Sequence, residues 1–443
     1  MTIVLAHGLG GSTDLPIPFT YVLIGATWAL AVSFAVLAFA WRTPKLDPDS
    51  PGHSLPIWVT RFADSPVTRN VLSALALLFT IWVGVAAFFG PAESTANALP
   101  GVFYVVLWVG LVVVSLAVGP IWRVLSPVRT MHRLVCAARG RPTSAGNSRY
   151  RTSWGYRPAV LGLFAFVWLE LAWDDPGSVA AVRTWCVVYL VVTSAGAFVF
   201  GERWCERGDP FEVYSTLASK LSPLSRRRDD GRIVLRNPLD HLGSMPVRAG
   251  SVALMATLLG STAFDSFSAF PWWSRTVDGF DGAAATLART AGLLTFICFV
   301  GVSFWLAARA TGGLSGRQRA GLPGQLSHSL IPIVIGYVFA HYLTYLVEKG
   351  QATAILLADP LGRGWNVLGL GNAEVAYVLS EHPGATASIK VLCVVTGHIL
   401  GVIAAHDKSV SVLPRNHQLT GQLALLLTMV TYTFGGLYLL FGG

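Results

Sequence analysis

Long apolar stretches recur along the chain, and this pattern restricts the fold more than any other feature. A helix rises ~1.5 Å per residue, so about 20 apolar residues cross the ~30 Å hydrocarbon core of a bilayer. We therefore predict an all-α polytopic integral membrane helical bundle, forming a single transmembrane domain over residues 1–443 with about ten transmembrane helices. The predicted spans are 19–41, 71–90, 101–122, 158–173, 178–201, 249–267, 284–308, 327–347, 386–406 and 419–441.

The composition agrees with a membrane protein and argues against a soluble one. Hydrophobic residues make up 53% of the chain and charged residues only 12%, whereas soluble domains are about 25% charged. The five cysteines form no CxxC pair, so we predict buried thiols rather than a disulfide framework or a zinc ribbon.

The distribution of basic residues predicts the orientation of the chain. If both termini lie outside, 26 of the 32 lysines and arginines fall at the cytoplasmic face and six at the outer face, as the positive-inside rule requires. The sequence thus predicts an N-out, C-out membrane protein whose basic loops lie in the cytoplasm. Its basic cytoplasmic loops are 123–157 and 202–248, and the apolar spacing of Phe211 to Leu224 predicts a helix on the inner membrane face. The net charge of +9 follows from this asymmetry and does not indicate nucleic acid.

Ionisable residues inside predicted spans are the candidate functional groups, because burying them in a membrane is costly. They are Glu170 in the fourth span, Asp265 in the sixth, His341 in the eighth and His398 in the ninth. Tyr337 precedes His341 by four residues, which places both on one helix face. Most of the five lie at a similar depth in the outer leaflet, so we expect an outward-facing cavity.

Three interpretations of these residues remain open. Two histidines with carboxylates suit a divalent metal such as zinc or iron, and His7, between glycines on the N-terminal tail, is a further candidate ligand. The same groups also suit a proton relay, or they are separate buried polar groups, each satisfied locally. Known local motifs do not distinguish these three interpretations, because HExxH, GxSxG and the phosphate-binding loop are all absent from the sequence. Hydrolysis by serine, histidine and aspartate is not excluded, but no serine stands out as a nucleophile.

Several segments resemble a family of bacterial multi-pass membrane proteins commonly labelled fenitrothion hydrolase, over nearly the whole chain. The segments are His7-Gly8 with Asp14-Leu15-Pro16-Ile17-Pro18, Leu235-Arg236-Asn237-Pro238-Leu239, Gly260 to Asp265, His328-Ser329-Leu330-Ile331-Pro332 with Gly336-Tyr337 and Ala340-His341-Tyr342, and Gly397-His398-Ile399-Leu400-Gly401 with Ala405-His406-Asp407. The resemblance implies an organophosphate phosphotriesterase activity.

Together these observations predict a membrane-embedded hydrolase of an apolar, phosphotriester-like substrate that enters from the outer leaflet. A metal held by His341, His398 and His7 would activate water, Glu170 or Asp265 would be a further ligand or the general base, and Tyr337 would donate to the leaving oxygen. The alternatives are a transporter or channel that uses the same residues for an ion or small solute, and a non-catalytic assembly protein. The expected partners are membrane lipids and a small apolar substrate or ion. The sequence predicts no oligomeric state.

Overall fold

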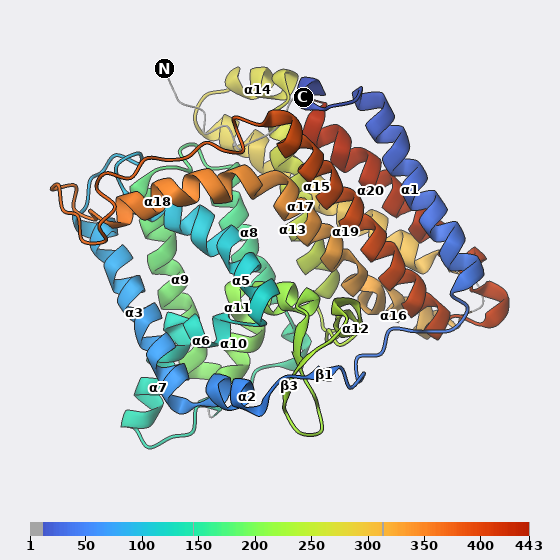
Figure 1. The fold of residues 1–443 in the computed structure, drawn as a ribbon, viewed down its shortest axis with the longest axis horizontal. Coiled ribbons are helices and arrows are strands. Elements are labelled where there is room, and N and C mark those ends of the chain that lie inside the picture. Colours follow the sequence, from blue (N-terminus) through green and yellow to red (C-terminus); the bar gives the residue numbers. More distant parts are fainter. Residues whose placement is uncertain (1–11, 145, 312–313, 443) are drawn as a thin grey trace.

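A computed structural model describes residues 12–144, 146–311 and 314–442. Figure 1 shows long helices packed side by side into a bundle, which confirms the predicted all-α fold. The long elements are α1 (Phe19–Ala40), α3 (Pro66–Phe89), the π-helix η2 (Val102–Gly110) continued by α5 (Leu111–Val118), α8 (Arg157–Leu171), α9 (Val179–Phe200), α13 (Ser251–Ser268), α15 (Ala283–Arg309), α17 (Ile331–Thr344), α19 (Pro383–Val412) and α20 (Leu423–Phe441).

Shorter elements connect the long helices. The α-helices are α2 (Ile57–Asp64), α4 (Ala98–Gly101), α6 (Trp122–Leu125), α7 (Pro127–Ala138), α10 (Glu202–Gly208), α11 (Pro210–Ala218), α12 (Pro238–Leu242), α14 (Pro271–Asp278), α16 (Gly316–Leu326) and α18 (Gly350–Leu357). The single turns are η1 (Ser12–Asp14), η3 (Thr152–Trp154), η4 (Ser219–Leu221), η5 (Ser327–Leu330), η6 (Tyr345–Lys349), η7 (Arg415–His417) and η8 (Thr420–Gln422). The strands β1 (His53–Ser54), β3 (Ile233–Leu235) and β2 (Leu224–Arg226) form a small antiparallel sheet in that order.

The number of membrane-spanning helices differs from the predicted ten. Within the described residues, eight helices are long and apolar enough to cross a membrane, and the count becomes nine if α13 and α14, bent by 83° at their junction, form one span. The predicted span 158–173 forms α8, whose 15 residues extend only ~22 Å at ~1.5 Å per residue. Length and composition thus establish a multi-pass membrane protein with eight or nine candidate spans.

The ends of the long helices show how α8 and α13 run through the bundle. Their first residues lie together, because the Tyr156 N–H donates to the Ala249 carbonyl over 2.7 Å. At the other end of α8, the Trp168 indole donates to Thr290 near the start of α15 over 2.9 Å. Phe19 at the start of α1 contacts Tyr438 near the end of α20. Both described termini therefore lie at one end of the bundle, opposite the starts of α8 and α13 (Figure 1).

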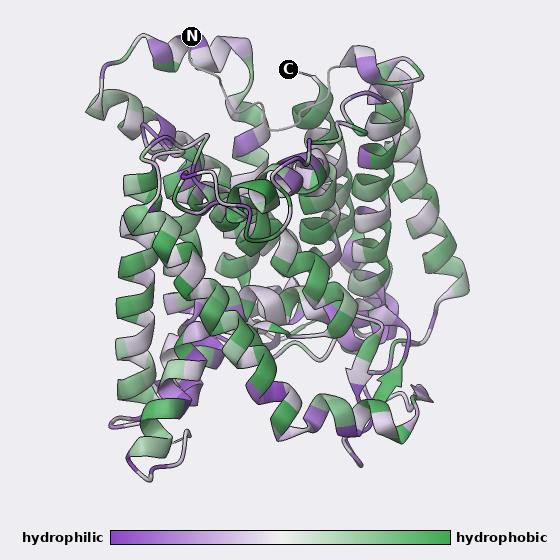
Figure 2. Ribbon diagram, turned by 60° about the vertical axis from the view of Figure 1, so that its left-hand side comes forward, coloured by the Kyte–Doolittle hydropathy of each residue, from purple (hydrophilic) through white to green (hydrophobic). Residues whose placement is uncertain are grey.

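We call the end that holds α2, α7, α12 and the small sheet the basic end, because it carries most of the arginine-rich connections (Figure 1). Figure 2 shows that hydrophobic residues dominate the long helices and that hydrophilic residues concentrate toward the bundle ends. Outward-facing side chains of the helices are apolar and exposed, including Trp28, Phe39, Leu161 and Leu427. Exposed apolar faces of this extent are stable in lipid rather than in water.

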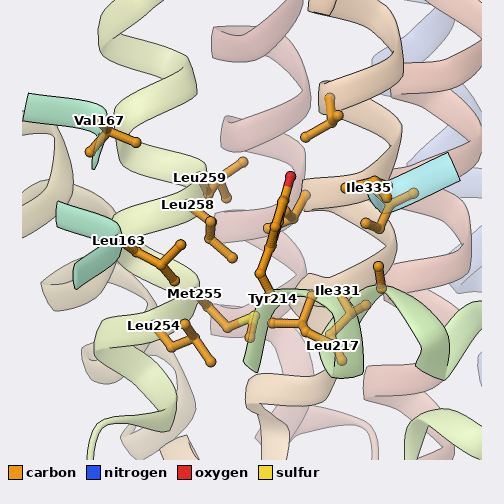
Figure 3. Close-up of a cluster of buried hydrophobic side chains, with 14 of the residues drawn as sticks. Leu163, Val167, Tyr214, Leu217, Leu254, Met255, Leu258, Leu259, Ile331 and Ile335 are labelled. Carbon is orange, nitrogen blue, oxygen red and sulfur yellow. The ribbon is translucent and has the colours of Figure 1, made fainter. Parts of the chain in front are cut away.

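The segment Pro210–Ala218 corrects one prediction. We expected it on the inner membrane face, but α11 lies inside the bundle, with Phe211, Glu212 and Tyr214 fully buried. Figure 3 shows the Tyr214 ring among leucines and isoleucines of α8, α13 and α17. Two ionic interactions offset the cost of burying the charged groups of this segment. Asp209 caps the N-terminus of α11, and Arg129 binds both carboxylate oxygens of Glu212, at 2.5 and 2.7 Å.

Helices α17 and α19 approach each other closely at two glycines. A Cβ atom at Gly336 would lie 2.5 Å from the Cys393 carbonyl oxygen, and one at Gly397 would lie 2.6 Å from the Pro332 carbonyl oxygen. Small residues at such crossings let membrane helices pack backbone against backbone. This crossing fixes α17, which carries the central residues of the candidate site.

Candidate functional site

Asp265 and His341 form a buried polar pair across the interface of α13 and α17. The His341 Nε2 atom lies 2.8 Å from the Asp265 Oδ2 atom, and the Tyr342 hydroxyl donates to the same oxygen over 2.9 Å. The three side chains are between 0 and 4% exposed. Charged groups this deeply buried are stable only when they are paired and hydrogen-bonded, so the pair is held in a defined geometry.

Ser266 and Tyr337 extend this pair on the other side of the imidazole. The Ser266 Oγ atom lies 3.2 Å from His341 Nδ1 and 3.1 Å from the Tyr337 hydroxyl. Tyr337 in turn donates to the Gly436 carbonyl over 3.2 Å. Because Nε2 faces a carboxylate, it carries the proton in the neutral imidazole, and Nδ1 accepts from Ser266. Asp265, His341, Ser266 and Tyr337 thus form a continuous chain of buried polar groups, which we call the relay chain.

Glu170 lies beside the relay chain. It is buried in α8, and its charge interacts with that of Asp265. Four tyrosines surround the two carboxyl groups closely enough for their hydroxyls to be affected by the Glu170 charge: Tyr104, Tyr214, Tyr342 and Tyr345. The structure therefore brings together Glu170, Asp265, His341 and Tyr337, four of the five residues that we expected around one cavity.

His398 lies apart from this cluster. Its Nδ1 atom donates to the Val394 carbonyl of its own helix over 2.8 Å, and no hydrogen bond or ion pair among the described residues joins it to Asp265 or His341. The predicted ligand His7 lies outside the described residues. Within the described ranges, no group of three or more histidine, cysteine, aspartate or glutamate side chains has an arrangement that could hold a metal ion. Asp265 and His341 supply two donors, so a zinc or iron site remains a prediction.

Ser266 and Tyr342 were not among the predicted site residues. Each follows a predicted residue directly in the sequence, at Asp265-Ser266 and His341-Tyr342. Neighbours in a helix point about 100° apart, so sequence spacing alone places only one of each pair on the shared face. Both reach the cluster because α13 and α17 pack closely along this length.

An apolar groove lies on the other side of η2 from Glu170. It has a volume of about 550 Å³, and helices α3, η2, α5 and α9 line it. Phe103 and Leu107 face this groove, whereas Tyr104 faces the Glu170 charge and Trp108 stacks on Tyr214 at 4.7 Å. A π-helical segment in this position is typical of functional sites. The groove offers an apolar molecule in the membrane a place to bind.

The comparisons with known proteins add no family or relative. No family model matches the chain, and no curated protein or solved structure is significantly similar to it. The resemblance to the family labelled fenitrothion hydrolase therefore stays a prediction, and the argument for function depends on the site.

Proposed function

We propose that the protein is a proton-coupled membrane transporter in which the relay chain binds and passes the proton. One observation carries the proposal: four groups that can each gain or lose a proton follow one another at hydrogen-bond distance, and all are at most 4% exposed. A substrate that had to touch these atoms would need the helices to separate. A proton needs only the hydrogen bonds.

The chemistry of each group supports proton transfer along the chain. The charge of Glu170 interacts with that of Asp265, so Glu170 is a further group to which Asp265 can pass a proton. Tyr337 takes up a proton as it passes its own hydroxyl proton to Ser266, and Ser266 in turn passes its hydroxyl proton to His341 Nδ1. His341 then releases its Nε2 proton to the Asp265 carboxylate. Imidazole suits this role because it binds and releases protons on two different atoms.

The experiment measures proton movement in sealed vesicles. The purified protein is reconstituted with a pH-sensitive dye inside, and a pH gradient is imposed. We expect Asp265→Asn and His341→Gln to abolish the dye response, and Tyr337→Phe to reduce it strongly. Tyr432→Phe is the matched control, because the Tyr432 hydroxyl donates to the Val300 carbonyl outside the relay chain. Unchanged proton movement in the first two variants, or none in the wild type, would contradict the proposal.

We also propose that the bundle crosses the bacterial cytoplasmic membrane ten times, with the basic end in the cytoplasm and both termini outside. Termini at one end of the bundle require an even number of crossings, so α8 and α13 either both cross or both do not. Both α8 and α13 run from the basic end to the opposite end, which supports counting both as crossings and gives ten in total. The arginine-rich basic end supports the orientation through the positive-inside rule.

The order of groups in the relay chain also supports a second candidate, the predicted hydrolase. Ser266, His341 and Asp265 follow one another as nucleophile, base and carboxylate do in hydrolases. Ser266 Oγ would attack phosphorus while His341 Nδ1 takes its proton and delivers it to the departing oxygen. Water would then break the Oγ–P bond, and its proton would return through His341 to Ser266. The apolar groove beside η2 would admit the phosphotriester.

A covalent probe separates the two candidates. A fluorophosphonate labels an activated serine, so the hydrolase predicts labelling of the wild type and loss of label in Ser266→Ala. Ser303→Ala is the control, because Ser303 lies on α15 and bonds to Tyr432 rather than to the relay chain. If Ser266 is not labelled and no chromogenic phosphotriester is hydrolysed, the hydrolase is ruled out while the transporter stands.

A further inference from the structure

A second polar cavity lies at the basic end, far along the helices from the relay chain. It has a volume of about 160 Å³, more than ten times the ~10–15 Å³ that one water needs. Arg123, Lys220 and Arg248 line it, together with the single carboxylate of Glu206. The cavity therefore has room for a polar group and an excess of positive charge.

The cations of this cavity are held in place but are poorly neutralised. Lys220 donates to the Ser244 hydroxyl over 2.8 Å, and Arg248 donates to the Tyr156 hydroxyl over 2.8 Å. Neither cation forms an ion pair with a carboxylate of the described residues. Arg123 reaches Glu212 only at 3.7 Å, and Arg129 already binds both oxygens of that carboxylate.

Burial of Lys220 and repulsion from the cations around it make its charge unfavourable without an anion. Desolvation and the charges of Arg123 and Arg228 lower the pKa of Lys220 to about 8. The nearby His241 does not compensate, because burial lowers its pKa to about 4 and it is neutral at physiological pH. Clustered cations that outnumber the carboxylates around them are typical of phosphate-binding sites.

We propose that this cavity binds a phosphate group through Arg123, Lys220 and Arg248. Apolar side chains such as Leu217, Met245 and Leu254 also line the cavity, which lies where α8 and α13 begin. Basic pockets between membrane helices at the cytoplasmic side bind anionic lipid headgroups. Two sources share this chemistry, the headgroup of an anionic phospholipid and a soluble phosphate.

Binding to the purified full-length protein tests the proposal and separates the two sources. One arm titrates phosphatidylglycerol or phosphatidylcholine and counts retained lipids by native mass spectrometry. The other adds inorganic phosphate alone and measures thermal stabilisation. We expect the double variant Lys220→Gln with Arg248→Gln to weaken phosphatidylglycerol binding about ten-fold or more, since each basic residue near a membrane surface strengthens binding by about five-fold. Lys220→Arg should preserve binding. Arg61→Gln is the control, because Arg61 is an exposed arginine of α2 that does not line the cavity.

Each outcome has a defined meaning. Loss of phosphatidylglycerol in the double variant, with no effect of inorganic phosphate, supports a lipid headgroup as the ligand. Stabilisation by inorganic phosphate that disappears in the double variant supports a soluble phosphate. If the folded double variant retains the wild-type response to both probes, the phosphate site is disproved.

Discussion

Single residues of the relay chain differ in how much stability they should contribute. Asp265→Ala leaves His341 buried without its carboxylate, and breaking such a pair costs about 3–5 kcal/mol. Tyr342→Phe removes one hydrogen bond to the same carboxylate, for which we expect a loss of about 0.5–1.5 kcal/mol. Unfolding experiments in mild detergent measure the loss in the free energy of unfolding for both variants. Equal losses would mean that Asp265 is not stabilised mainly by His341.

The phosphate site should depend on pH through Lys220. Its pKa of about 8 means that Lys220 is mostly charged below pH 8 and loses its proton as the pH rises above 8. Phosphatidylglycerol is a diester that does not titrate in this range, and the neighbouring arginines stay charged. We therefore expect its binding to weaken between pH 7 and about 9. Lys220→Arg should bind equally at both pH values, and a wild type without this dependence would contradict the assignment.

At the scale of elements, the crossing of α17 and α19 determines where His341 lies. Gly336→Ala and Gly397→Ala would place a Cβ atom within 2.6 Å of backbone oxygens, so the helices must separate. We expect each variant to lose about 1–3 kcal/mol of stability, as overpacked cores do, with weaker proton movement. Gly435→Ala on α20 is the control, because its Cβ would meet nothing within 4 Å. A similar loss in the control would show that the effect is not one of packing.

At the scale of the whole molecule, cysteine labelling tests the number and direction of crossings. Asp175→Cys in the α8–α9 turn and Tyr377→Cys before α19 should react with an impermeant maleimide from outside the cell. Asp229→Cys beside the small sheet should react only after the membrane is permeabilised, which gives the reagent access to the cytoplasmic face. Each variant is made in a chain whose five native cysteines have been replaced, so each labelling signal reports one position. Labelling of Asp175→Cys from the same side as Asp229→Cys would contradict the ten-crossing topology.

The sequence by itself determined the class of fold and most residues of the candidate site. Apolar run length predicts membrane helices because the thickness of the bilayer fixes it, and buried charges such as Asp265 and His341 stand out because they are costly there. Sequence could not show that α8 is only 15 residues long, because the ends of a helix depend on packing against neighbouring segments.

Only the tertiary structure decided which candidate residues lie together. His398 lies in the same kind of apolar helix as His341, yet packing brings only His341 to Asp265. The same holds for Ser266 and Tyr214, which look like ordinary residues of a helix and of a basic loop. Their roles depend on contacts between segments far apart in the chain, and such contacts leave no local pattern in the sequence.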